Sequence, residues 1–147
     1  MSDAPSGPVP AKISLVTLGV SDLARSGAFY DALGWERVGD NEGVIFYRMA
    51  GAHLALFPVT SLAEDAHVAP DRSGFFGASL AINCASEAEV DAVFAHLASM
   101  GATVLKLAER VFWGGYSGYF EDPDGFVWEV AYNPGWPLDE RGLPQLG

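Results

Sequence analysis

Several residue types are scarce in this sequence, and each scarcity excludes a class of protein. Cys84 is the only cysteine, so the chain can form neither an internal disulfide nor a cysteine-rich zinc site. Only 8 Lys and Arg residues stand against 19 Asp and Glu residues, and a formal charge of -11 repels the phosphates of nucleic acids and of anionic membranes. No hydrophobic run reaches the roughly 18 residues of a membrane-spanning helix. We therefore expect neither nucleic acid nor membrane among the partners of this chain.

Signals for export are also missing. The first residues, MSDAPSGPVPAK, lack the apolar stretch of a signal peptide. Together with the single cysteine, this predicts a cytoplasmic protein, because disulfide-rich chains belong to oxidising compartments. The 147 residues, 50% of them hydrophobic, are enough for one compact domain with a substantial core.

What the chain does contain is a pattern that occurs twice. Residues 13–20 alternate in hydropathy as a strand does, residues 21–34 place apolar side chains at helical spacing, and three short β-rich runs follow up to residue 59. The same order of strand, helix and three strands returns in residues 78–132. A duplicated module of this kind must bury its helix and one face of its strands against the other copy.

The repeats predict an α+β fold. Two tandem β-α-β-β-β modules, at residues 12–59 and 78–132, are expected to form a curved mixed sheet or incomplete barrel around a pocket. The residues between them show no sustained period and are interpreted as a connector. The expected boundaries are a flexible tail at 1–11, a single domain at 12–133 with its connector at 60–77, and a C-terminal tail at 134–147.

One face of the predicted strands is suited to a pocket rather than to a core. The opposite face carries bulky apolar residues that would pack beneath the helices. The face suited to a pocket carries small or mildly polar residues that would line a concavity. They are Leu15, Thr17, Gly19, His53, Ala55, Phe57, Ser79, Ala81, Asn83, Glu129 and Ala131.

Two segments carry a family resemblance. LGVSDLARSGAFYDALGW and GYFEDPDGFVWEVAYNP resemble the first strand and helix and the closing hairpin of the vicinal oxygen chelate superfamily. That superfamily contains glyoxalase I, extradiol dioxygenases, fosfomycin-resistance enzymes and bleomycin-resistance binding proteins. The resemblance implies its fold over almost the whole chain, a small-molecule ligand, and a homodimer, since members commonly dimerise.

The resemblance also implies four positions for metal ligands, one on the first and one on the last strand of each module. These positions fall on Leu15, Ala55, Ser79 and Glu129, of which only Glu129 agrees with the family pattern. One carboxylate and one hydroxyl do not make a transition-metal site, which needs three or four well-placed ligands. We therefore expect no metal ligands and no cofactor, with a divalent metal relocated to His53 and Glu129 left open.

Candidate site residues follow from the same face. Glu129, a charged residue inside a strand, needs a partner or a ligand, and it is equally consistent with an ordinary pairing, a general base or an anchor for a ligand. Trp113 and Tyr116, within a run of aromatics and glycines, are predicted to form a stacking wall. The predicted ligand-binding set is Phe57, Ser79, Asn83, Trp113, Tyr116 and Glu129.

Three functions are compatible with these residues. The first is a metal-independent protein that binds or sequesters an aromatic or cationic compound. The second is an enzyme of lyase, isomerase or dioxygenase type that uses Glu129. The third is an interaction module whose aromatic C-terminal segment, around Trp136, docks on a partner or a second copy.

Overall fold

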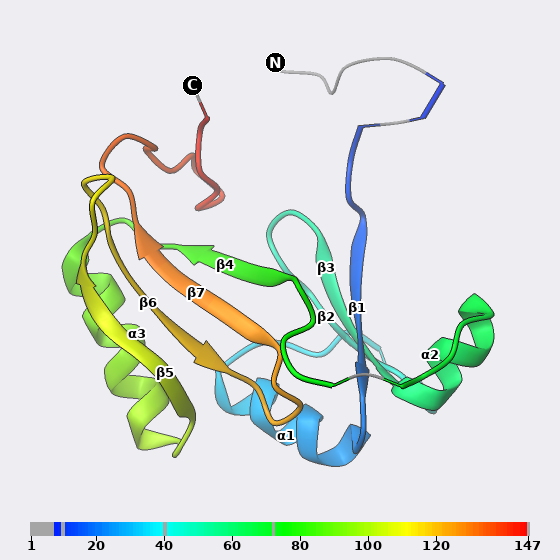
Figure 1. Cartoon of the computed structure of the whole chain (residues 1–147). Coiled ribbons are helices and arrows are strands. Elements are labelled where there is room, and N and C mark those ends of the chain that lie inside the picture. The colour runs from blue at the N-terminus through cyan, green and yellow to red at the C-terminus, as the bar shows by residue number, and fades with distance from the viewer. Residues whose placement is uncertain (1–7, 10, 40, 72, 147) are drawn as a thin grey trace.

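The computed structural model describes residues 8–9, 11–39, 41–71 and 73–146; the predicted flexible tail lies largely outside these ranges. Within them the chain folds into two mixed, unclosed sheets with helices on their outer sides (Figure 1). The elements in chain order are β1 (Leu15–Val20), α1 (Leu23–Ala32), β2 (Ile45–Tyr47), β3 (His53–Pro58), α2 (Val59–Ala66), β4 (Ser79–Asn83), α3 (Glu87–Ser99), β5 (Thr103–Arg110), β6 (Tyr116–Glu121) and β7 (Val127–Tyr132).

The two modules share one topology. In the first, the strand order is β1-β3-β2, with β1 and β3 parallel; in the second it is β4-β7-β6-β5, with β4 and β7 parallel. Each module thus pairs its first strand with its last, across the helix that separates them in sequence. The predicted α+β duplication is confirmed, but as two sheets rather than one shared sheet.

Two local expectations differ from the structure. The β-rich run after α1 forms only an isolated bridge between Arg37 and Tyr47, so the first module has one strand fewer. The connector contains α2, whose residues Val59 and Leu62 lie against Gly19 on β1. A helix here was not predicted because Pro58 begins it without any side-chain cap.

The helix ends were predictable from single residues. The Asp22 side chain accepts a hydrogen bond from the Arg25 backbone at 3.0 Å and begins α1, while Ser86 caps α3 by accepting from the Glu89 backbone at 3.1 Å. Gly34 and Gly101 follow α1 and α3 with positive φ angles of 93° and 69°, which side chains disfavour. No described helix has the length and apolarity needed to cross a lipid bilayer.

A buried polar network joins the two modules. The Tyr30 hydroxyl on α1 donates to Asp122 Oδ2 at 2.7 Å and accepts from the Trp128 indole at 3.1 Å. Asp122 Oδ1 in turn accepts from the backbone of Asp124 and Phe126 and so holds the turn between β6 and β7. This turn, residues 122–125, is the DPDG sequence, and it docks on the first module's helix.

The C-terminal segment is folded, not a loose tail. Residues 133–146, which we call the strap, contain a bridge between Leu138 and Pro144 and a hydrogen bond from the Gln145 backbone to the Pro137 carbonyl at 2.9 Å. Leu143 of the strap lies beside Gly51, in the turn between β2 and β3. The strap therefore runs from the end of the four-stranded sheet to the edge of the three-stranded one.

Candidate functional site

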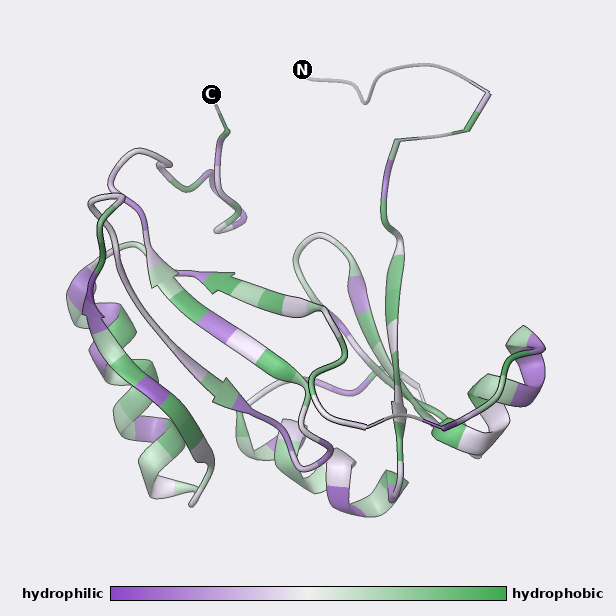
Figure 2. Cartoon of the chain, viewed as in Figure 1, coloured by the Kyte–Doolittle hydropathy of each residue, from purple (hydrophilic) through white to green (hydrophobic). Residues whose placement is uncertain are grey.

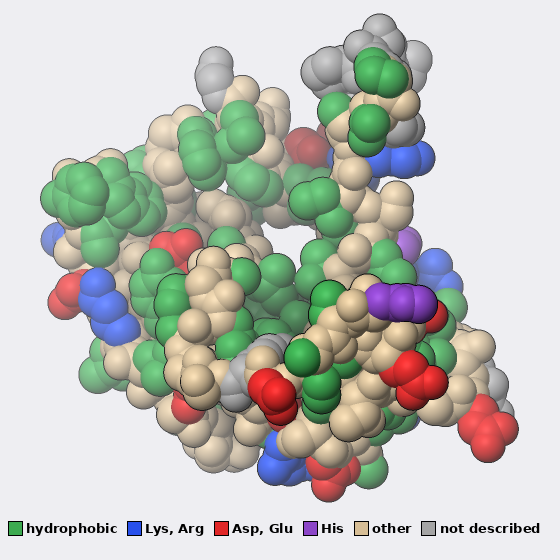
Figure 3. All heavy atoms as spheres, turned by 45° about the vertical axis from the view of Figure 1, so that its right-hand side comes forward, with side chains coloured by type: hydrophobic (Ala, Val, Ile, Leu, Met, Phe, Trp, Pro, Cys, Tyr) green, Lys and Arg blue, Asp and Glu red, His purple; other side chains and the backbone are tan. Residues whose placement is uncertain are grey.

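A cavity of about 430 Å³ lies on the inner face of the four-stranded sheet, near the strap. The molecule is visibly hollowed between its two halves (Figure 3). Four lining residues come from the parallel pair β4 and β7, one from the turn between β5 and β6, and two from the strap. They are Ala81, Asn83, Glu129, Ala131, Trp113, Asn133 and Trp136.

Glu129 lies at the centre of a row of side chains that crosses the sheet. Strand register pairs it with Ala81 on β4 and with Tyr119 on β6, and Tyr119 with Lys106 on β5. Ala81 is too small to cover the carboxylate, so Glu129 is only half-buried and open to the cavity. β7 is otherwise largely hydrophobic, with a hydrophilic band at its middle (Figure 2).

Tyr119 on β6 is the polar residue paired with Glu129 across the sheet. Burial, then the charge of Glu129 and hydrogen bonding to it, raise the pKa of Tyr119, whereas Lys106 acts in the opposite direction. Tyr119 therefore keeps its proton at neutral pH and can donate a hydrogen bond to Glu129. Lys106 is itself paired with Glu109 at 3.1 Å, which leaves Glu129 as the negative group facing the cavity.

The indole of Trp113 is held in place by its own turn. The backbone of Val111 donates to the Gly115 carbonyl at 2.9 Å, and that of Gly114 donates to the Val111 carbonyl at 3.0 Å. The ring lies so close over Gly115 that a side chain there would overlap it. Glycine at this position thus explains how the turn places an aromatic wall beside the sheet.

The structure brings together three of the six predicted ligand-binding residues: Asn83, Trp113 and Glu129. Tyr116 lies on the other face of the sheet, because it pairs with Tyr132 and its hydroxyl donates to Asp91 on α3 at 2.6 Å. The predicted wall of Trp113 and Tyr116 is therefore not formed. Ser79, on the right face, stands exposed two residues before Ala81 and does not line the cavity.

Phe57 is also separate from Glu129. It contributes instead to a shallow hollow beside α2, with Ser61, Glu64 and His67. His53, which was expected on the pocket face with a relocated metal left open, accepts a hydrogen bond from the Met49 backbone at 3.0 Å through Nδ1. This is an ordinary turn interaction and gives His53 no part in the cavity.

Three residues of this site were missed from the sequence. The sequence places Asn133 at the end of the predicted domain and Trp136 in the predicted C-terminal tail, and only tertiary packing of the strap brings them over the cavity. Tyr119 could have been found, because it stands on the same face of β6 as Ser117 and directly opposite Glu129 in a hairpin closed by the DPDG turn.

The side chains do not fit the metal site that the family resemblance implies. The first-strand positions hold Leu15 and Ser79, and the last-strand positions hold Ala55 and Glu129, which supply one strong ligand in all. Within the described ranges, no three His, Cys, Asp or Glu side chains lie close enough to hold one ion.

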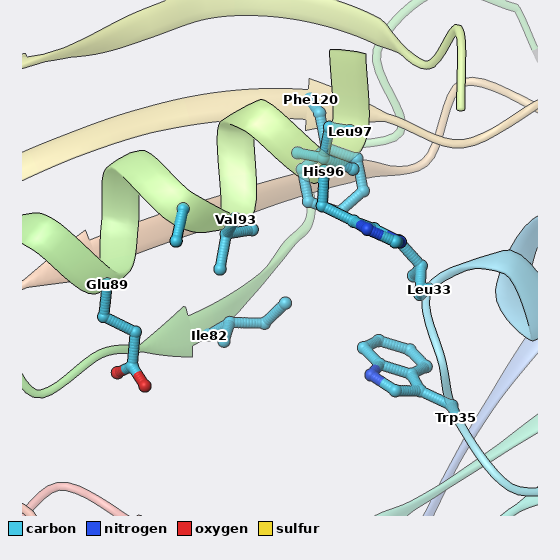
Figure 4. Close-up of a pocket in the computed structure, with 9 residues that line it drawn as sticks. Leu33, Trp35, Ile82, Glu89, Val93, His96, Leu97 and Phe120 are labelled. Atoms are coloured by element: carbon cyan, nitrogen blue, oxygen red, sulfur yellow. The ribbon is translucent and has the colours of Figure 1, made fainter. Parts of the chain in front are cut away.

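A second cavity, of about 310 Å³, lies on the outer face between α3 and the segment after α1 (Figure 4). Its walls are mostly apolar, with Trp35, Ile82 and Phe120 among them. His96 at its rim is bound to the Ala32 carbonyl at 2.7 Å through Nε2. The second rim residue, Glu89, accepts from the Ala85 backbone at 2.7 Å as part of the α3 cap. Because both polar groups at the rim are engaged structurally, the Glu129 cavity is the better candidate site.

Comparisons with known proteins agree with this architecture. Residues 12–130 match the model of the Glyoxalase/Bleomycin resistance protein/Dioxygenase superfamily. A glyoxalase-related enzyme from Fulvimarina pelagi is 38% identical, with a TM-score of 0.84 over 93% of this chain and 99% of that one. A lactoylglutathione lyase from Agrobacterium tumefaciens is 27% identical, with a TM-score of 0.69 over 89% of this chain and 100% of that one. No curated protein sequence matches significantly.

Proposed function

Because the chain belongs to the glyoxalase/bleomycin resistance protein/dioxygenase superfamily, we propose that it binds a small organic cation with aromatic character in the Glu129 cavity. The observation that carries this proposal is the joint position of Glu129, Trp113 and Trp136 around one cavity. A carboxylate favours a positive charge, and indole faces attract organic cations through their π electrons. Binding or sequestration of such a compound would then need no metal.

The polar groups around Glu129 support a charged or hydrogen-bonding ligand. Asn83 and Asn133 each present an amide, which can accept from or donate to a ligand, and no described Lys or Arg lines the cavity. A ligand with a carboxylate or phosphate would meet Glu129 without a compensating cation. The cavity therefore favours a cationic ligand over an anionic one.

Titration with benzyltrimethylammonium tests this proposal. The intrinsic tryptophan fluorescence should change on binding, because two of the four tryptophans line the cavity. Glu129→Gln should weaken binding at least about tenfold, a loss of about 1.4 kcal/mol. Glu42→Gln removes the same charge from an exposed turn and is the matched control. Equal affinities for both variants would contradict the proposal.

A catalytic role for the same carboxylate is the second candidate. Tyr119 and Glu129 together offer a proton donor and a base, and the 38% identical relative is described as an enzyme. Glu129 could then serve as general base in a lyase, isomerase or dioxygenase-type reaction. Loss of turnover in Glu129→Gln with ligand affinity retained would favour this candidate over simple binding.

Two properties of the whole protein are proposed with this function, a cytoplasmic location and a homodimer. Light scattering coupled to size-exclusion chromatography tests the dimer. Elution as a monomer at micromolar concentration would reject it.

A further inference from the structure

A second chamber adjoins the Glu129 cavity on the other side of Trp136. Its volume is about 330 Å³. It lies beneath the strap, at the ends of β4 and β7. Trp136 and Asn133 line both spaces, so the two spaces meet at these residues and we call the pair the partition. The other walls of the strap chamber include Cys84, Tyr132, Pro134, Pro137 and Leu138.

The backbone of Trp136 is held by hydrogen bonds, whereas its indole ring is held by none among the described residues. The Trp136 backbone donates to the Asn133 carbonyl at 3.0 Å, and the Gly135 backbone donates to Asn133 Oδ1 at 2.9 Å. Its indole nitrogen has no hydrogen-bond partner in the described part of the chain, and the residue is 41% exposed. Rotation of the ring would therefore break no described hydrogen bond.

The two chambers differ in chemistry. The first holds the Glu129 carboxylate and the Asn83 amide, whereas the strap chamber is walled mostly by prolines, a leucine, the Tyr132 side chain and the buried thiol of Cys84; the Asn133 amide borders both. Walls of this kind favour an aliphatic or aromatic group over a charged one, because no charged side chain lines this chamber among the described residues. A molecule that filled both would have one charged end and one apolar end.

We propose that Trp136 is a gate between the two chambers and that the ligand is elongated, with a cationic head at Glu129 and an apolar tail in the strap chamber. This inference rests on the proposed function, because it takes the head group from it. It adds the tail, the subsite that receives the tail, and the residue that controls access to that subsite.

The test compares two probes that share a head group. Benzyltrimethylammonium reaches only the first chamber, and (4-phenylbutyl)trimethylammonium has three more methylenes with which to reach the second. Calorimetry on the full chain should give at least about tenfold tighter binding of the longer probe. Trp136→Ala should raise this ratio by opening the partition and removing a wall from the short probe's site. Ala85→Phe, in the strap chamber, should reduce it toward one by filling the space.

Trp113→Ala is the control, because Trp113 lines the first chamber alone and its loss should weaken both probes without changing their ratio. Thermal unfolding of each variant verifies that it is folded. If both probes bind but neither Trp136→Ala nor Ala85→Phe changes the ratio, the gate is overturned while the proposed function stands. If neither probe binds the wild-type chain, the proposed function is overturned and the gate with it.

Discussion

Tyr30 and Asp122, 92 residues apart in the sequence, are joined by a buried hydrogen bond of 2.7 Å. The hydroxyl belongs to the helix of the first module and the carboxylate to the turn that closes the second. Burial raises the pKa of Asp122, and the hydrogen bonds from Tyr30, Phe126 and Asp124 offset part of that increase. A buried carboxylate of this kind is stable only while its donors are present.

Tyr30→Phe should therefore destabilise the fold. The substitution removes a donor to Asp122 and an acceptor for the Trp128 indole, leaving two buried polar groups short of a partner. We expect a loss of about 1 to 3 kcal/mol in the free energy of unfolding, measured by urea titration with circular dichroism. Tyr132→Phe is the matched control, because no described group bonds the Tyr132 hydroxyl. A smaller effect for Tyr30→Phe than for this control would show that the bond contributes nothing.

Acid should weaken the junction through Asp124. Burial alone would raise the pKa of this carboxyl, but hydrogen bonds from Ser21 and Ser26 and the charge of Arg25 outweigh it and hold the pKa below its ordinary 3.8. The charged form is thus favoured by folding, so its contribution is present above about pH 4 and is lost as the pH falls through the folded pKa.

Asp124→Asn tests this directly. The variant should be less stable than the wild type at pH 7, by about 1 to 3 kcal/mol, and the difference should shrink as the pH falls below 3.8. Denaturant titrations at a series of pH values measure it, with Asp71→Asn, in an exposed segment, as the control. A difference that does not vary with pH would assign the effect to packing rather than to charge.

Cys84 should be unreactive in the native protein. Burial, followed by the charge of Glu89 and hydrogen bonding to it, raises the pKa of the thiol to about 12. Almost none of it is thiolate at pH 8, and the thiolate is the reactive form. Labelling with a disulfide reagent should be slow in buffer and rapid in denaturant. Complete labelling of native protein within minutes would show that the strap chamber admits the reagent and ionises the thiol.

Gly115→Ala should displace Trp113 from the cavity. The added methyl group overlaps the indole ring, which must leave its position. We expect weaker binding of benzyltrimethylammonium and an altered tryptophan emission spectrum. In a Trp113→Ala background the same substitution has no ring to displace, so the double variant should bind like Trp113→Ala alone. Additive losses would indicate that Gly115 acts on the ligand by another route.

The duplicated fold could be predicted because its signals are local. Alternation in residues 79–83, the cap at Ser86 and the glycine at 101 each act within a few residues. Glu129 and Asn83 could be placed on one face for the same reason, since side chains alternate along a strand.

The rest of the site depends on longer-range packing. Residues 111–115 form a turn that resets the alternation, so the face of Tyr116 is decided by its pairing with Tyr132 and cannot be counted from Trp113. Trp136 enters the site only because the strap crosses toward Gly51. Neither relationship leaves a periodic signal in the sequence.

The junction between the modules also affects the order in which the chain can fold during synthesis. Ser26 and Tyr30 of α1 bond to Asp124 and Asp122, 98 and 92 residues later. During synthesis the first module leaves the ribosome before Asp122 and Asp124 have been added to the chain. Until then the Ser26 and Tyr30 hydroxyls of α1 can hydrogen-bond only to water. The junction between the two modules can therefore form only after the DPDG turn, near the end of the chain, has been synthesised.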